Sequence, residues 1–389
     1  MTLQTGYFGI DLPIAAAALP TTNTGLSWYN VQRRRLHKFA KQFIITGSLA
    51  VETLRSQGEA DITIPDVIST REGFTQLRRD LPVMDQYFEY SGDLDYLARI
   101  KDLCLSWART NIPDGKPINE SNLEALVRVM HRRQGDFSAT ELADIDAWVQ
   151  SLRAAKEAAA AVLFSAQMVE GEGVTRHGNW WTHHYKVLLL ALRYQGDDPA
   201  ISTLLAEIDD FIPRNLPYGN PAVTYPPRPD LFDAALYDMP RAATAPGETI
   251  DYIRRDALHY QLYDLMPWLE IALAEGGGRY EPVIESAWAF FFAVMLSPAK
   301  HYEFAASSDS FDGQRWSASH PEYLAPQAMF KPQFAAGLVL QYMYWRRSRA
   351  PMAYIEDDLH VALACRAVPE IASFWPQYFR WALGVGANG

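Results

Sequence analysis

The chain of 389 residues is short of cysteine and of positive charge, and both shortages exclude classes of protein. Its two cysteines, Cys104 and Cys365, form no CxxC pair, which argues against a thiolate metal site and leaves at most one disulfide. Cys104 lies in an apolar helical pattern, as is typical of a buried and unreactive thiol. The formal net charge of −11 argues against a nucleic-acid partner, because phosphate binding needs clustered cations.

The chain also lacks any apolar run of the roughly 18 residues that a membrane-spanning helix needs, so we expect no membrane partner. The N-terminal stretch MTLQTGYFGIDLPIAAAALP has no basic segment before its short alanine run, so it does not resemble a signal peptide. We expect either a secreted or periplasmic protein whose export signal is absent from this sequence, or a cytoplasmic protein. The oligomeric state stays open.

Familiar catalytic and nucleotide-binding motifs are missing as well. The sequence contains no GxGxxG or Walker loop, no HExxH, no GxSxG and no kinase signature. The glycines at 276–278 follow a helical pattern, so they are expected to end a helix. His183 and His184 are adjacent, and adjacent side chains on a helix point about 100° apart, which makes them a poor metal pair. We therefore expect no essential metal and no cofactor.

What the sequence does contain is helical periodicity and many aromatic residues. Hydrophobic residues make up 49% of the chain and charged residues 21%, which excludes disorder. The 11 Trp, 20 Tyr and 18 Phe suit a large helical core, and they also suit flat faces for sugar rings. Apolar residues at three- and four-residue steps predict helices over residues 28–54, 72–90, 93–109, 120–134, 139–168, 180–195, 199–212, 254–275, 279–296, 328–347, 354–367 and 370–384.

Helix-end signals and loops organise these segments. Ser138–Glu141 reads SATE, a capping box, and Pro199 suits the first turn of a helix. Mostly short connections predict successive antiparallel helical hairpins, and therefore one all-α domain over residues 1–389. The proline-rich stretch 213–253 is the longest irregular segment, and loops of that length are either functional or disordered.

Three segments concentrate polar chemistry. The first reads TRHGNWWTHHYKVLLLAL (175–192) and places Asn179 and His183 four residues apart, on one face of a helix. Trp180, Trp181 and His184 flank them. The alternative is structural, with Asn179 as a helix N-cap and the histidines on the surface.

The second segment is the start of the predicted helix 254–275. Within seven positions it carries two arginines, a histidine and a tyrosine, namely Arg254, Arg255, His259 and Tyr260. The alternative is a salt-bridged helix start, in which Asp251 and Asp256 pair with the arginines. The third segment is a predicted loop, 297–327, whose polar residues could equally belong to a plain surface loop; they are Lys300, His301, Glu303, Asp309, Asp312 and Arg315.

At these residues the chain resembles the alginate-lyase-like superfamily of polysaccharide lyases. Four blocks carry the resemblance, in matching order and approximate spacing: NIPDGKPINESNLEALV (111–127), GNWW (178–181), RRDALHYQLYDLMPWLEIA (254–272) and HYEFAASSDSFDGQRW (301–316). The likeness runs over residues 75–345, and it is greatest to the branch that contains glucuronan and alginate lyases.

The resemblance implies an incomplete (α/α)n toroid of about six or seven helical hairpins. It also implies cleavage of a 1,4-linked polyuronate, an acidic polysaccharide partner, by β-elimination. Position by position, Tyr260 falls on the catalytic tyrosine, Arg254 on the substrate arginine and Asn179 on the asparagine that neutralises the uronate. Many relatives read Asn-Asn-His where this chain has Trp180, so His183 is our substitute for the family histidine. His177, His184 and His301 stay open for that role.

The remaining expectations concern substrate binding and two rival functions. We expect substrate-binding roles for Trp180, Trp181, His184, Arg255, His259, Lys300, His301 and Arg315, although one of the two tryptophans should pack in the core. One rival is a glycoside hydrolase on the same toroid, with carboxylates drawn from Asp251, Asp256 and Asp264. The other is a uronate-binding protein without catalytic activity.

Overall fold

The computed structural model describes residues 37–55, 64–163, 177–219, 224–225, 241–275, 278–296, 302–305, 307 and 312. The chain divides into two compact units. The first comprises Met1–Ala159, Leu190–Gly196 and Ala336–Gly389, and the second comprises Ala160–Leu189 and Asp197–Ala335. The predicted helices beyond residue 327 lie outside the described residues, and the single domain over 1–389 stays a prediction.

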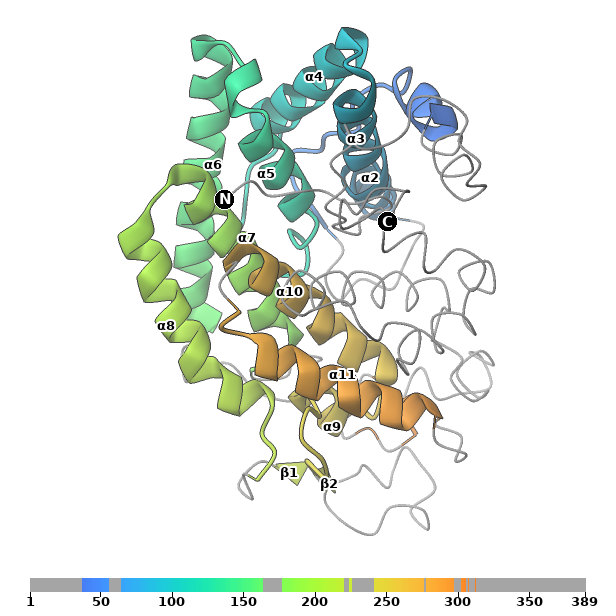
Figure 1. Ribbon diagram of the computed structural model, residues 1–389, viewed down its shortest axis with the longest axis vertical. Coiled ribbons are helices and arrows are strands. Elements are labelled where there is room, and N and C mark those ends of the chain that lie inside the picture. Colours follow the sequence, from blue (N-terminus) through green and yellow to red (C-terminus); the bar gives the residue numbers. More distant parts are fainter. Residues whose placement is uncertain are drawn as a thin grey trace, which may run out of the picture. The chain divides into compact units, whose positions relative to one another are not determined.

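The first unit is helical throughout its described elements (Figure 1). Residues 37–43 are helical. The elements that follow are α2 (Pro65–Thr75), a π-helical turn (Gln76–Asp80), α3 (Leu81–Ser91), α4 (Leu94–Thr110), α5 (Leu123–Arg132), a 3₁₀ turn (Gln134–Asp136) and α6 (Ala139–Leu163), which continues from Ala160 into the second unit. The helix predicted at 72–90 therefore begins earlier, at Pro65, where a proline suits the first turn.

The helix predicted over 28–54 is wrong in its second half, because residues 44–55 are not helical. Gln76 explains the difference. Its side-chain Oε1 accepts a hydrogen bond from the Leu49 N–H at 2.9 Å, and its Nε2 donates to the Gly47 carbonyl at 2.8 Å. The amide of Gln76 thus satisfies one backbone donor and one backbone acceptor of this non-helical segment.

The capping box predicted at SATE is confirmed at the start of α6. The Ser138 N–H donates to Glu141 Oε2 at 2.7 Å, and the Glu141 N–H donates to Ser138 Oγ at 3.4 Å. The hydrogen bond from the Ser138 N–H, followed by the contact with Lys101, lowers the pKa of Glu141 to about 2.

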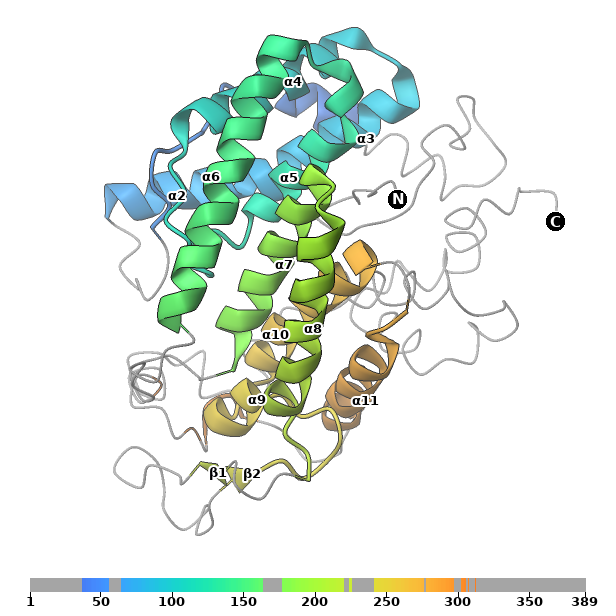
Figure 2. The ribbon, with the colours of Figure 1, turned by 90° about the vertical axis from the view of Figure 1, so that its left-hand side faces the viewer.

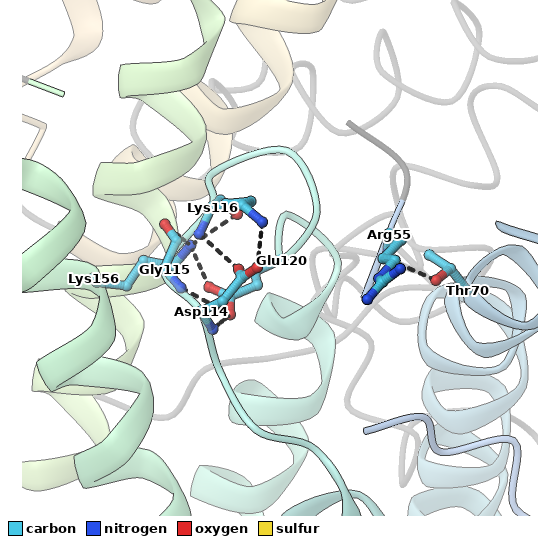
Figure 3. Close-up of polar contacts among 7 residues, drawn as sticks. All are labelled: Arg55, Thr70, Asp114, Gly115, Lys116, Glu120 and Lys156. Atoms are coloured by element: carbon cyan, nitrogen blue, oxygen red, sulfur yellow. Dashed lines mark hydrogen bonds and ion pairs between the residues drawn. The ribbon is translucent and has the colours of Figure 1, made fainter. Parts of the chain in front are cut away.

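A buried ion pair fixes the loop before α5 against α6 (Figure 3). Glu120 accepts hydrogen bonds from the N–H groups of Asp114 and Gly115, and Lys156 Nζ lies 2.7 Å from Glu120 Oε2. Lys156 also donates to the Gly115 carbonyl at 3.2 Å. Gly115 has a positive φ of 79°, and a Cβ there would lie 2.2 Å from the Ala155 carbonyl oxygen, so only glycine fits this close approach.

The second unit contains the first part of α7 (Asn179–Gln195), up to residue 189, together with the next six elements. These are α8 (Asp198–Asn215), α9 (Ile250–Arg255), α10 (Leu258–Glu275), α11 (Glu281–Leu296) and a strand pair, β1 (Thr224–Tyr225) and β2 (Arg241–Ala242). The strands are antiparallel, with Thr224 opposite Ala242, and they lie beside α9 (Figure 2). The stretch predicted to be irregular thus contains regular structure.

The helix predicted over 254–275 is wrong as a single helix, because Asp256 breaks it. Asp256 has a left-handed conformation with φ of 51°, which ends α9 at Arg255 before α10 begins at Leu258. Its N–H bonds to the Tyr252 carbonyl at 2.7 Å, and its own carbonyl accepts a hydrogen bond from the Phe304 N–H at 2.8 Å. The predicted arginines and the predicted tyrosine therefore lie on two different helices.

Buried contacts hold α10 in place within the second unit. Trp268 Nε1 donates to Asn215 Oδ1 of α8 at 3.0 Å, and the rings of Trp268 and Phe211 stack at 6.2 Å. Gln261 accepts a hydrogen bond from the Thr249 N–H and donates to the Gly247 carbonyl, which joins α10 to the start of α9. None of the helices in the described part of the chain is long and apolar enough to cross a membrane.

Candidate functional site

The predicted site residues that the structure describes all belong to the second unit. They occupy the start of α7, the end of α9 and the start of α10, and they are Asn179, Trp180, Trp181, His183, His184, Arg254, Arg255, His259 and Tyr260. Most are buried, and only Trp180 and His259 are partly exposed. Lys300, His301 and Arg315 lie outside the described residues.

Asn179 is bound to a carboxylate of α9. Its backbone N–H and its side-chain Nδ2 both donate to Asp251 Oδ2, the second bond at 2.8 Å. Gly178 makes this contact possible, since a Cβ at that position would lie 2.4 Å from the same oxygen. The side chain of Asn179 thus binds another helix as a donor, which differs from the role of an N-cap acceptor.

A second buried carboxyl group, Asp264 of α10, lies beside Asp251. Thr182 Oγ1 donates to Asp264 Oδ1 at 3.0 Å and also contacts the Asn179 carbonyl oxygen at 3.0 Å. Asn215 Nδ2 lies 3.4 Å from the same Asp264 oxygen. Burial, and then the neighbouring Asp251 carboxylate, raise the pKa of Asp264 well above its usual range.

An aromatic cluster joins α7 to α10. The rings of His183 and Tyr263 have their centroids 4.4 Å apart, and Tyr263 stacks on His259 at 5.9 Å with an interplanar angle of 11°. The same Tyr263 meets Tyr260 edge-on at 6.4 Å. Tyr263 was not among the predicted site residues, although its position three residues after Tyr260 places both on one face of α10.

Tyr260 lies between an aromatic wall and a guanidinium group. It packs with Ala257 and Phe304, and its ring centroid lies 6.0 Å from that of Phe304. Arg255 Cζ lies 3.8 Å from the centroid of the Tyr260 ring, within the range of a cation–π interaction. The phenol therefore has positive charge beside it, supplied by the last residue of α9.

Arg255 is itself fixed by an ion pair with Asp312. Its Nε donates to Asp312 Oδ2 at 2.9 Å and its Nη2 to Asp312 Oδ1, and Ser307 Oγ donates to Asp312 Oδ2 at 2.7 Å. The expected alternative paired the arginines with Asp251 and Asp256, but the partner of Arg255 is 57 residues away in the sequence. The pairing of Arg255 with Asp312 could not be inferred from residues close to Arg255 in the sequence.

Glu303, a polar residue of the predicted loop 297–327 to which the sequence assigned no role, caps the start of α10. Its two carboxyl oxygens accept hydrogen bonds from the N–H groups of Leu258, at 2.9 Å, and His259, at 3.2 Å. Burial raises the pKa of Glu303 to about 8, against the opposing effect of these hydrogen bonds. A titratable group thus supports the helix turn that carries Tyr260.

The two tryptophans differ in exposure. Trp181 is 1% exposed and its ring lies 5.8 Å from that of His177, so it is the tryptophan that packs in the core. Trp180 is partly exposed. His184 is buried against Tyr185, with ring centroids 5.7 Å apart. Within the described residues, no group of three or more His, Cys, Asp or Glu side chains is placed to hold a metal ion.

The fold is similar to that of two solved alginate lyases. Alginate lyase A1-III from Sphingomonas species A1 is 13% identical, over 88% of this chain and 83% of that one, with a TM-score of 0.48. An alginate lyase from Bacteroides ovatus is 11% identical, over 86% of this chain and 88% of that one, with a TM-score of 0.52. No protein-family model and no curated protein matches the chain.

The likeness to the Bacteroides ovatus enzyme shows that this chain has an alginate-lyase-like fold. The fold class predicted from the sequence, an all-α (α/α)n toroid, is thereby confirmed. At 11% identity the likeness extends to the fold alone.

Proposed function

We propose that this chain is a polysaccharide lyase that cleaves a 1,4-linked polyuronate, either alginate (including polymannuronate) or glucuronan, by β-elimination. One observation carries the proposal. The His183 ring of α7 lies against Tyr263 of α10. Tyr263 and Arg255, the last residue of α9, both lie against the ring of Tyr260. The alginate-lyase-like fold supports it.

The first chemical task is to stabilise negative charge on the uronate carboxylate. The C5 proton is weakly acidic, because its loss turns a carboxylate into a dianionic enolate. Donors aimed at that carboxylate can each contribute about 3–4 kcal/mol in the transition state. In our proposal Asn179 donates through its amide and Arg254 through its guanidinium, with His183 assisting.

The second task is proton transfer. Tyr260, as the phenolate, takes the C5 proton; the C5–H electrons form the C4=C5 double bond, and the C4–O bond breaks. In a syn elimination the same phenol then protonates the leaving oxygen, whereas an anti elimination needs a second group on the other face, for which we propose His183. Arg255 supports Tyr260 with a positive charge 3.8 Å from the ring centroid.

Substrate binding is proposed for the remaining predicted residues, with Trp180 as the platform for a sugar ring because Trp181 is buried. The net negative charge of the chain would repel a polyanionic substrate unless cationic side chains are gathered near the site. We assign that role to Arg255, Lys300, His301 and Arg315, together with the histidines His184 and His259.

The hydrolase alternative requires two carboxyl groups about 5–9.5 Å apart across a sugar. Asp251 and Asp264 are buried in one network around Asn179, and Asp256 forms the break between α9 and α10. These positions favour structural roles for the three residues. The products separate the two reactions, since elimination leaves an unsaturated, ultraviolet-absorbing uronate end and hydrolysis leaves none.

The test is incubation with polymannuronate, polyguluronate, glucuronan and a neutral glucan, with ultraviolet absorbance and reducing ends both measured. We expect absorbing ends from at least one polyuronate and none from the glucan. Tyr260→Phe should lower the rate by about 10²- to 10⁴-fold, since it removes the acid–base group. Tyr218→Phe, at an exposed tyrosine of the same unit, is the matched control and should retain the wild-type rate.

Two results would reject the proposed reaction. New reducing ends without absorbance would identify a hydrolase, and polyuronate binding without any product would identify a binding protein. A Tyr260→Phe variant with the wild-type rate would remove Tyr260 from the mechanism, in which case Tyr263→Phe becomes the informative substitution.

A further inference from the structure

The residue that holds Asn179 in place is Asp251. The carboxylate of Asp251 is 1% exposed, and its Oδ2 atom receives both the backbone N–H and the side-chain Nδ2 of Asn179. Because the same oxygen binds the backbone N–H at one end of the residue and the amide nitrogen at the other, the Asn179 side chain has little freedom to rotate. The contact therefore sets the direction of the whole Asn179 side chain.

The chemistry of the contact also sets which amide atom faces which side. A carboxylate only accepts hydrogen bonds, so the nitrogen of Asn179 must face Asp251. The nitrogen carries two hydrogen atoms, and Asp251 uses one of them. The second N–H and the carbonyl oxygen then point away from Asp251, where the second N–H can donate to a uronate carboxylate.

Asp264 is the second buried carboxyl group of this network. Two adjacent buried carboxyl groups resist being ionised together, and burial and then Asp251 raise the pKa of Asp264 well above its usual range. Thr182 and Asn215 both approach its Oδ1 atom. Thr182 links this carboxyl group to Asn179, because its hydroxyl also contacts the Asn179 carbonyl oxygen.

Gly178 shows how closely Asp251 is fitted to the start of α7. An added Cβ would lie 2.4 Å from Asp251 Oδ2 and 2.8 Å from its Oδ1, so the carboxylate occupies the space that any other residue would fill. The sequence feature that makes room for Asp251 is therefore the glycine immediately before Asn179.

We propose that Asp251, supported by Asp264, is the positioning residue that orients the amide of Asn179 toward the substrate carboxylate. Asp251 acts through Asn179 and does not touch the substrate. This inference rests on the proposed lyase function, and it adds to that function the groups that prepare the amide before substrate arrives.

A double-mutant cycle tests the proposal, with kcat/KM on the polyuronate that the wild type cleaves fastest. We expect Asn179→Ala to lower kcat/KM by about 10²- to 10³-fold, as loss of one donor does. Asp251→Ala should lower it by roughly tenfold or more, as loss of a supporting carboxylate does at other sites. Because Asp251 acts through Asn179, the combined variant should stay within about twofold of Asn179→Ala.

The matched control is Asp209→Ala, which removes an exposed carboxylate of the same unit from its ion pair with Arg279 and should leave kcat/KM unchanged. Losses that multiply in the combined variant would overturn the proposal, because a merely structural role for Asp251 would add to the loss of Asn179.

A second measurement needs neither catalytic activity nor a folded Asp251 variant. The side-chain amide signals of Asn179, identified in ¹⁵N NMR spectra by their absence from Asn179→Ala, should exchange slowly with water and differ clearly in shift from each other. Signals like those of exposed asparagines would overturn the proposal. A wild type that forms no product rejects the lyase function, yet this measurement still decides how Asn179 is held.

Discussion

The ion pair between Arg255 and Asp312 gives the sharpest stability prediction. Both side chains are almost fully buried, at 4% and 0% exposure, and the guanidinium is bound through two nitrogen atoms. Removing one partner leaves the other charge buried and uncompensated, which costs about 3–5 kcal/mol. We therefore expect Asp312→Asn to lower the free energy of unfolding by about that amount.

The comparison variant is Asp209→Asn. Asp209 also pairs with an arginine, Arg279, but the two side chains are 40% and 41% exposed. Exposed pairs contribute about 0–1 kcal/mol, because water screens them and their side chains lose entropy. The two substitutions change the same chemical group, so the difference between them measures the effect of burial.

Urea unfolding of the wild type and both variants, followed by circular dichroism, supplies the measurement. Replacing both partners, as in Arg255→Met with Asp312→Leu, should be less damaging than Asp312→Asn alone, because no uncompensated charge remains. If Asp312→Asn costs no more than Asp209→Asn, the reasoning from burial is refuted.

Three further predictions concern pH and packing. Folding raises the pKa of Glu303 from 4.5 to about 8, so the protonated form is favoured in the folded state. Its contribution to stability should be full below about pH 4.5 and fall as the pH rises to about 8, and Glu303→Gln should remove this fall in thermal unfolding. Folding lowers the pKa of Glu141 from 4.5 to about 2, so its contribution to stability should be present above about pH 4.5 and disappear as the pH falls to about 2. Glu141→Gln should reduce this loss of stability at acid pH, measured in the same way. Gly178→Ala should destabilise the fold by about 1–3 kcal/mol and abolish lyase activity by displacing Asp251, whereas Gly135→Ala, with nothing within 4 Å of the added Cβ, should do neither.

The sequence predicted the local features of the fold well. Helical periodicity found α4, α7 and α11 within one or two residues, and the capping box at Ser138 is present as expected. These features depend on residues within a few positions of one another. The second half of the helix predicted over 28–54 is wrong for the opposite reason, since Gln76, far along the chain, binds the backbone of Gly47 and Leu49 in the non-helical segment.

The difference between local and long-range contacts also explains which parts of the candidate site could be predicted. Spacing and resemblance drew attention to Asn179 and Tyr260, which the structure places in one unit. Their surroundings were not predictable in this way, because Asp251 reaches Asn179 across 72 residues and Asp312 reaches Arg255 across 57. Long-range ion pairs leave no periodic signal in a sequence, and Tyr263 was hidden within an ordinary amphipathic pattern.

Asp256, the left-handed residue between α9 and α10, changes what the sequence separation of Arg254 and Tyr260 implies about their positions in space. On an unbroken helix, six residues would separate Arg254 and Tyr260 by about 9 Å along the axis and turn their side chains about 120° apart. Asp256 frees the guanidinium and the phenol from that constraint, because each follows its own helix axis. An insertion or deletion at 256–257 would therefore change the angle between two helix axes instead of rotating Tyr260 around one. Counting residues between arginine and tyrosine is for that reason a poor guide when related chains are aligned.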